Sequence, residues 1–181
     1  FDSPMGESTG AAAIFGATGG VMEAALRTAA SWLTGSDGAP VDFVEVRGVE
    51  GVKEATYQVG DLTLNVAVAS GLANAKRLLD SVKSGEKTYH FIEIMGCPGG
   101  CVNGGGQPVQ PARIRNWVDL KSLRAAALYQ EDKDLPLRKS HENPTLQQIY
   151  KEFLKSPGSH VAHQVLHTSY RKLDRFHQGK A

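Results

Sequence analysis

Hydrophobic and polar residues follow two different periods in the first half of the chain. Residues 19–32 carry their apolar side chains at helical spacing, and the run Gly35-Ser-Asp-Gly is typical of a helix end. Residues 54–59 and 62–69 instead form two short apolar runs on either side of Gly60-Asp61, and the second of them alternates. A two-residue turn of this type between such runs predicts a β-hairpin, with Leu62, Leu64, Val66 and Val68 on one face.

Two more strands and a helix follow from the same reading. Residues 41–46 alternate and predict a strand, a helix is expected from Ser70 or Gly71 to about Lys83, and residues 89–95 form an apolar, β-branched run that predicts a short buried strand. Strands interleaved with helices predict an α/β fold, namely a lobe in which helices flank a mixed β-sheet.

The pattern changes after residue 110. Apolar residues recur through residues 111–129, and the charged stretch QEDKD follows as an expected link. Asn143-Pro144 has the composition of a helix N-cap and first position, residues 156–159 interrupt that helix, and residues 160–170 predict a last short one. We therefore expect a lobe over residues 1–130 and a C-terminal helical belt over residues 131–181.

Composition narrows the class of protein without identifying it. The chain has 181 residues, is 41% hydrophobic, and carries 20 basic against 19 acidic side chains. This near balance gives no electrostatic reason to expect nucleic acid or a membrane surface as partner, and no apolar run is long enough to span a bilayer. Two cysteines do not make a disulfide scaffold and suit a reducing, cytoplasmic location.

The segment from Glu93 to Pro108, EIMGCPGGCVNGGGQP, carries both cysteines and the most specific chemistry of the chain. Cys97 and Cys101 lie in a glycine-rich loop at the carboxyl end of a predicted strand, where ligands bind in open α/β sheets. The spacing alone leaves two interpretations open. Two thiolates can be part of an iron–sulfur or zinc site, although such sites usually take four ligands, or they can be free thiols or a redox-active disulfide in a tight turn.

As a whole string, this segment resembles the third cysteine motif of the [FeFe]-hydrogenase catalytic domain, E-x-M-x-C-x-x-G-C-x-x-G-G-G-Q-P. Every fixed position of that motif is met. The stretches IFGATGGVMEAALRTA (14–29) and RKSHENPTLQQIYKEFL (138–154) resemble the C-terminal half of the same family, so the resemblance extends over nearly the whole chain.

The resemblance implies a cofactor, the H-cluster, which is a [4Fe-4S] cubane joined to a diiron unit with carbonyl and cyanide ligands. Cys97 would hold the cubane, and Cys101 would bridge it to the diiron unit. Phe15 and Gly16 would line the diiron unit, and Met95 would lie beside it. The family's other two cubane cysteines lie in upstream motifs of the types TSCCPAW and MPCxxKxxE, which this chain does not contain.

These missing motifs define the expected partner, an N-terminal half that carries the remaining cluster cysteines and the proton path. No residue of this chain is therefore assigned as catalytic. The chain opens at Phe1 without methionine, which suggests a split, cleaved or truncated polypeptide. The family resemblance also implies ferredoxin or a nicotinamide-linked module as redox partner.

Several residues keep a structural alternative beside the functional one. Residues 14–21 can be an anion-binding helix start or a strand-to-helix turn that needs glycine. Met95 can be core filler, and Glu93 reads as a buried acid paired with backbone or with a base. Gln107 and Pro108 are expected to shape the loop. His160, His163 and His167 can share a helix face as zinc ligands or as surface residues, and His141 can support the Asn143 cap or pack where the belt begins.

Three interpretations of the function follow. The first is an iron-only hydrogenase that reduces protons reversibly to H₂. The second is a non-catalytic iron–sulfur protein like the cytosolic cluster-assembly relatives, and a third reading is a structural subunit that docks onto a catalytic half. The hydrogenase-like stretches at 15–27 and in HENPTL favour the first.

Overall fold

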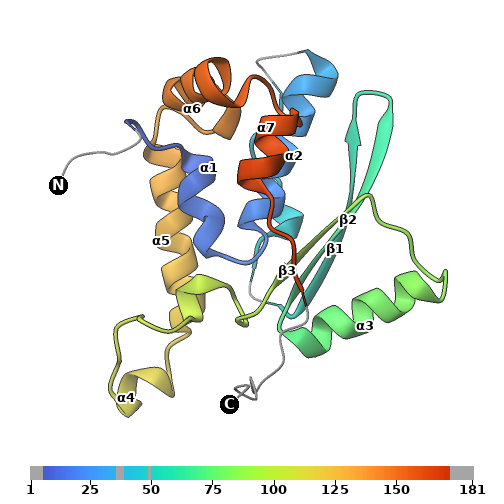
Figure 1. Ribbon diagram of the computed structural model, residues 1–181. Coiled ribbons are helices and arrows are strands. Elements are labelled where there is room, and N and C mark those ends of the chain that lie inside the picture. Colours follow the sequence, from blue (N-terminus) through green and yellow to red (C-terminus); the bar gives the residue numbers. More distant parts are fainter. Residues whose placement is uncertain (1–5, 36–38, 49, 172–181) are drawn as a thin grey trace, which may run out of the picture. The chain divides into compact units, whose positions relative to one another are not determined.

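A three-stranded mixed sheet forms the centre of the first of two compact units, Phe1–Asn143. The computed structural model describes residues 6–35, 39–48 and 50–171, and Figure 1 shows their ribbon. Strand β1 (Val52–Val59) pairs antiparallel with β2 (Leu62–Ser70), which pairs parallel with β3 (Phe91–Met95). The predicted hairpin is thus confirmed, and so is the α/β class.

Helices cover both faces of this sheet because β2 alternates its side chains between two apolar layers. Val66 and Val68 pack with Met22 and Leu26 of α2 (Gly20–Thr34) in one buried cluster. On the opposite face, Ala67 and Ala69 pack with Ala75 and Leu78 of α3 (Leu72–Lys83). Burial of these side chains, at roughly 25 cal/mol per Å² of apolar surface, holds the three layers together.

Shorter helices complete the first unit. They are α1 (Gly10–Ala13), the 3₁₀ turns η1 (Ile14–Gly16), η2 (Val44–Val46), η3 (Cys101–Asn103) and η4 (Ser140–Glu142), and the helices α4 (Ala112–Arg115) and α5 (Leu120–Asp134). Helix α5 runs alongside α1 (Figure 1). The second unit, Pro144–Ala181, contains α6 (Pro144–Ile149), the π-helical turn η5 (Tyr150–Leu154) and α7 (His160–Leu166).

Four expectations about elements need correction. Residues 41–46 are not a strand, because Phe43 and Val46 are the buried positions and their spacing of three closes a 3₁₀ turn. The QEDKD stretch is not a link but the last part of α5. The last helix ends at Leu166 and not at Tyr170.

The fourth correction concerns β3, which is shorter than predicted and only partly buried. It lies at one edge of the sheet, and Phe91 and Ile94 are 43% and 44% exposed.

Helix α2 ends at Thr34 and is followed by Gly35, which has a positive φ. The rest of the predicted end signal, residues 36–38, lies outside the described residues, and so does the turn-rich opening at 1–5.

Candidate functional site

The cysteine loop, residues 96–108, begins where β3 ends. The Cys97 carbonyl accepts a hydrogen bond from the Gly100 amide at 2.9 Å, and the Cys101 carbonyl accepts one from the Gly104 amide at 2.9 Å. Both cysteines are exposed, and neither forms a disulfide. The loop therefore presents two free thiols.

Side chains outside the cysteines fix the shape of this loop. The Gln107 side chain donates to the Cys101 carbonyl at 3.2 Å, and Arg124 of α5 donates to the carbonyls of Val102 and Pro108 at 3.0 Å each. The expectation that Gln107 and Pro108 shape the loop is confirmed. Arg124 was not anticipated, and it ties the loop to α5.

The loop rests on the segment that precedes α2, so the two glycine-rich motifs of the sequence meet. The Thr18 amide donates to the Gly99 carbonyl at 3.1 Å. Gly100 has φ +96°, and a Cβ there would lie 2.7 Å from the Gly16 oxygen and 2.7 Å from the Thr18 nitrogen. Only glycine fits both the backbone conformation and this close approach.

Glu93 occupies the amino end of α2. Its carboxylate, on β3, accepts hydrogen bonds from the Gly19 amide at 2.7 Å and the Met22 amide at 2.6 Å. The prediction that Glu93 is a buried acid paired with backbone is confirmed. The anion-binding interpretation of residues 14–21 is wrong, because this carboxylate already uses the free amides of the helix start. The expected need for glycine in this turn is confirmed, since Gly19 has φ +91°, but α1 and η1 precede the turn where a strand was expected.

Lys53 reaches the same turn from β1. Its Nζ donates to the Thr18 carbonyl and to the Gly48 carbonyl, both at 2.9 Å, and the residue is buried. Burial lowers the pKa of Lys53 to about 8, while the negative charge of Glu93 opposes that shift. Sequence reasoning missed Lys53, although its place two residues before the inward-facing Ala55 was a usable signal.

The three predicted cofactor residues come from two elements, Phe15 and Gly16 from η1 and Met95 from the end of β3. Phe15 is 45% exposed and borders a groove of about 370 Å³ whose other walls include Val21, Ala25 and Trp32 of α2. Gly16 faces α5, where an added Cβ would lie 2.7 Å from the Leu128 Cδ1 atom. Met95 pairs with Ser70 at the end of β3, and its carbonyl accepts from the Gly71 amide. The structure therefore gives Gly16 a packing role and leaves Phe15 on an open apolar surface.

Two thiolates fit an iron–sulfur group as part of its ligand set. Among the described residues, no three histidine, cysteine or acidic side chains come together as a metal site. His163 and His167 stack at 4.6 Å between ring centroids, and no third such ligand joins them in the described part of the chain. A cubane would need two more ligands from another segment.

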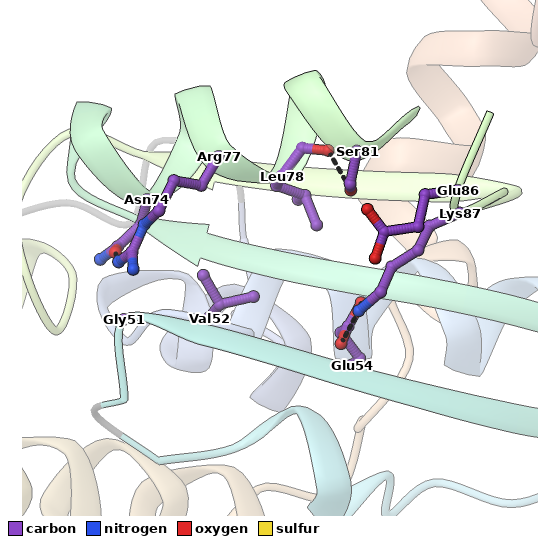
Figure 2. Close-up of a pocket in the computed structure, with 9 residues that line it drawn as sticks. All are labelled: Gly51, Val52, Glu54, Asn74, Arg77, Leu78, Ser81, Glu86 and Lys87. Atoms are coloured by element: carbon purple, nitrogen blue, oxygen red, sulfur yellow. Dashed lines mark hydrogen bonds and ion pairs between the residues drawn. The ribbon is translucent and has the colours of Figure 1, made fainter. Parts of the chain in front are cut away.

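A separate pocket of about 450 Å³ lies between β1 and α3 (Figure 2). Lys87 pairs with Glu54 at its rim, and Arg77 contacts Asn74. None of the five predicted site residues lines this pocket. Its lining is balanced in charge, with Glu54 and Glu86 as acidic residues and Arg77 and Lys87 as basic ones.

Helix α5, which supplies Arg124, is attached to α2 by buried ion pairs. Arg27 of α2 donates to both oxygens of Asp132 at 2.7 and 2.8 Å and to Glu23 at 2.9 Å. All three residues are fully buried. The guanidinium groups of Arg27 and Arg138 lower the pKa of Asp132 against the opposing effect of burial. Asp132 lies within the stretch that the sequence suggested was a solvated link.

His141 packs against α2. Its Nδ1 lies 3.0 Å from the Thr28 hydroxyl, and its ring lies 5.9 Å from the Trp32 ring. Burial lowers the pKa of His141.

Comparison with known proteins identifies the family of the chain. Residues 1–105 match the family model described as iron-only hydrogenase large subunit, C-terminal domain, and residues 118–173 match iron hydrogenase small subunit. The chain therefore belongs to the iron-only hydrogenase family. No helix in the described part of the chain is long and apolar enough to cross a membrane.

Individual relatives are similar to the chain over much of its length. It is 53% identical over 97% of its residues to the NADP-reducing hydrogenase subunit HndD of Solidesulfovibrio fructosivorans, of which it covers 29%. It is 59% identical over 61% of its residues to the periplasmic [Fe] hydrogenase large subunit of Nitratidesulfovibrio vulgaris, of which it covers 26%. The chain thus spans less than a third of the length of these relatives.

A solved structure and a different class of relative complete the comparison. The [FeFe]-hydrogenase HydA1 of Chlamydomonas reinhardtii superimposes with a TM-score of 0.67 at 40% identity, over 94% of this chain and 48% of that one. Protein NAR1 of Arabidopsis thaliana is 36% identical over 88% of this chain, which covers 33% of it.

Proposed function

We propose that this chain is the C-terminal part of the H-cluster domain of an iron-only hydrogenase that catalyses the reversible reduction of protons to H₂. The observation that carries this proposal is the cysteine loop. In a chain of this family, two free and exposed thiols lie on a loop that Gly100, Glu93 and Arg124 hold in one place. Such a loop presents two thiols as fixed ligands.

Each predicted site residue receives a role in this proposal. Cys97 would hold the cubane, and Cys101 would bridge it to the diiron unit, with Gly16 and Met95 beside that unit. Phe15 would cover it with an apolar ring that excludes water. The bound cluster would carry out the bond chemistry with electrons exchanged with a redox partner, while the chain supplies ligands and a dry environment.

The proposed partners follow from the missing ligands and from the relatives. An N-terminal half would contribute the other two cubane cysteines. The similarity to a subunit named as NADP-reducing favours a nicotinamide-linked redox partner over ferredoxin. We propose a cytoplasmic location from the free thiols, although one relative is named periplasmic, and cell fractionation of the parent protein decides between the two compartments. The division into a lobe at 1–130 and a belt at 131–181 also stays a proposal.

An infrared spectrum of the chain, purified anaerobically together with the upstream half of a relative, tests the cofactor. Carbonyl and cyanide stretches in a region free of protein bands are expected, because no protein group absorbs there. The chain carrying Cys101→Ala should lose the diiron bands. Full hydrogen evolution by that variant would contradict the bridging role of Cys101.

The second candidate is a non-catalytic iron–sulfur protein, favoured by the 36% identity to NAR1. It predicts iron and sulfide in the purified protein with no carbonyl or cyanide bands. The same spectrum therefore separates the two functions. Protein with neither iron nor bands, in the presence of the upstream half, would contradict both.

A further inference from the structure

Lys53 and Glu93 lie in one row across the sheet. Lys53 of β1 pairs with Val68 of β2, and Val68 pairs with Glu93 of β3. Residues directly opposite one another in paired strands point to the same face, so both charged side chains point toward α2. At roughly 4.8 Å between neighbouring strands, their backbones lie roughly 10 Å apart.

From the two edges of the sheet, these side chains hold the two ends of one peptide group. Lys53 Nζ donates to the Thr18 carbonyl at 2.9 Å, and the Glu93 carboxylate accepts from the Gly19 amide at 2.7 Å. The Thr18 carbonyl and the Gly19 amide belong to the same peptide bond. A donor on its oxygen and an acceptor on its N–H fix the plane of this peptide in a buried place, where such bonds are costly to break.

The clamped peptide adjoins the surface on which the cysteine loop rests. The Thr18 amide, which belongs to the preceding peptide bond, donates to the Gly99 carbonyl. Gly100 lies close against Gly16 and Thr18. A rotation of the Thr18–Gly19 peptide would therefore move the partner of Gly99. Gly19 itself has φ +91°, and a Cβ there would lie 1.9 Å from the Val46 carbonyl oxygen.

We propose that Lys53 is a positioning residue for the cysteine loop. By holding the Thr18–Gly19 peptide against Glu93, it fixes the segment that carries Gly99 and Gly100, and with them the places of Cys97 and Cys101. The identity of what the thiols bind rests on the proposed function above. The positioning itself concerns only groups within this chain.

The test compares Lys53→Met, which keeps the length of the side chain and removes its donors, with two control variants of the whole chain. Val59→Ala lowers the stability of the same core from the same strand without touching the turn. Lys87→Met removes an exposed lysine that pairs with Glu54. Amide hydrogen exchange by NMR measures the protection of each backbone amide separately. The amount of iron bound per chain after anaerobic reconstitution measures whether the thiols can still bind it.

For Lys53→Met we expect exchange at the Thr18, Gly19 and Gly100 amides to become about tenfold faster or more, as the loss of a buried hydrogen bond implies. Iron retention should fall in parallel. Val59→Ala should raise exchange by a similar factor throughout the core, without an additional increase at the Thr18, Gly19 and Gly100 amides. Lys87→Met should match the wild type in both measurements.

Normal exchange at these amides in a folded Lys53→Met chain would overturn the proposal, as would an even rise like that of Val59→Ala. If Lys53→Met does not fold, Lys53→Gln replaces it. The glutamine side chain keeps a donor but is one bond shorter, so its nitrogen does not occupy the position of Lys53 Nζ. The same local increase in exchange at the Thr18, Gly19 and Gly100 amides is expected. Failure of the wild-type chain to bind iron would count against the function of the loop, while the exchange comparison would still decide the role of Lys53.

Discussion

At the scale of single residues, Lys53 brings a titratable amine into the interior of the chain. Its ordinary pKa of 10.5 is lowered by burial to about 8. Between these two values the unfolded chain holds a proton that the folded chain has released. Since the unfolded state then binds more protons, the contribution of Lys53 to stability rises as the pH rises through this interval.

The pH dependence of unfolding should show this contribution. The free energy of unfolding of the wild type, minus that of Lys53→Met, should increase by about 2 kcal/mol between pH 7.5 and pH 9.5. Urea denaturation of both proteins at several pH values measures it, and groups that titrate alike in both proteins cancel in the difference. A difference that stays constant across this range would show that Lys53 does not titrate there.

The cysteine loop depends most directly on glycine at position 100, where a side chain would not fit. Gly100→Ala should lower the free energy of unfolding by about 1–3 kcal/mol through backbone strain alone, and the contact with Gly16 and Thr18 adds to this loss. Iron retention should also fall, because the loop must move away from residue 18.

Gly105→Ala is the matched control in the same loop. A Cβ at Gly105 would meet no heavy atom within 4 Å, and its φ is not positive. Thermal melts and iron content of this variant should resemble those of the wild type. Equal damage from both substitutions would indicate that the loop tolerates no side chain for a reason other than this contact.

At the scale of elements, the ion pairs between α2 and α5 decide whether α5 can hold the cysteine loop through Arg124. Asp132→Asn removes the charge that Arg27 and Arg138 share and leaves Arg27 buried beside Glu23. Breaking a buried pair in this way should cost about 3–5 kcal/mol of stability, measured by urea denaturation.

The exposed Asp134 on the same helix provides the comparison. Asp134→Asn affects only a surface hydrogen bond with Gln130, so its effect should stay within about 0.5 kcal/mol. An Asp132→Asn chain as stable as the Asp134→Asn chain would show that the buried pairs contribute nothing that an amide cannot replace.

The elements that the sequence predicted correctly are those with local signals. The hairpin follows from Gly60-Asp61 between two apolar runs, and α3 follows from Gly71 before an amphipathic stretch. The errors arose where a distant partner determines the environment. Asp132 looks solvated in sequence, and only its contact with Arg27, 105 residues away, shows that it is buried.

The support of the candidate site was not predictable from the sequence. The roles of Cys97 and Cys101 follow from the family resemblance of their motif, because their spacing alone left a metal site and free or redox-active thiols open, and these roles stay a prediction. Lys53, Arg124 and the use of Glu93 at the helix start could not be found, because each depends on which backbone group a folded neighbour places within reach.

At the scale of the whole molecule, the chain covers less than a third of its long relatives, so its exposed apolar groove should be assessed in a complete hydrogenase. Phe15→Ala removes the ring that we propose covers the diiron unit. The variant enzyme, assembled with the upstream half, should lose activity faster under oxygen than the wild type.

Leu33→Ala, at an exposed apolar position of α2 that does not line the groove, serves as the control. Its rate of inactivation by oxygen should equal that of the wild type. Unchanged inactivation kinetics in Phe15→Ala would assign Phe15 to packing alone.

The row of Lys53, Val68 and Glu93 makes the site sensitive to strand register. A shift of one residue in either pairing would send one of the two charged side chains to the opposite face of the sheet, where it could not reach the turn before α2. A misregistered chain could still collapse around its apolar residues, yet it would leave the cysteine loop without its support. Insertion of the proposed cluster would then select the chains whose three strands have paired correctly, so that metal loading would serve as a check on folding.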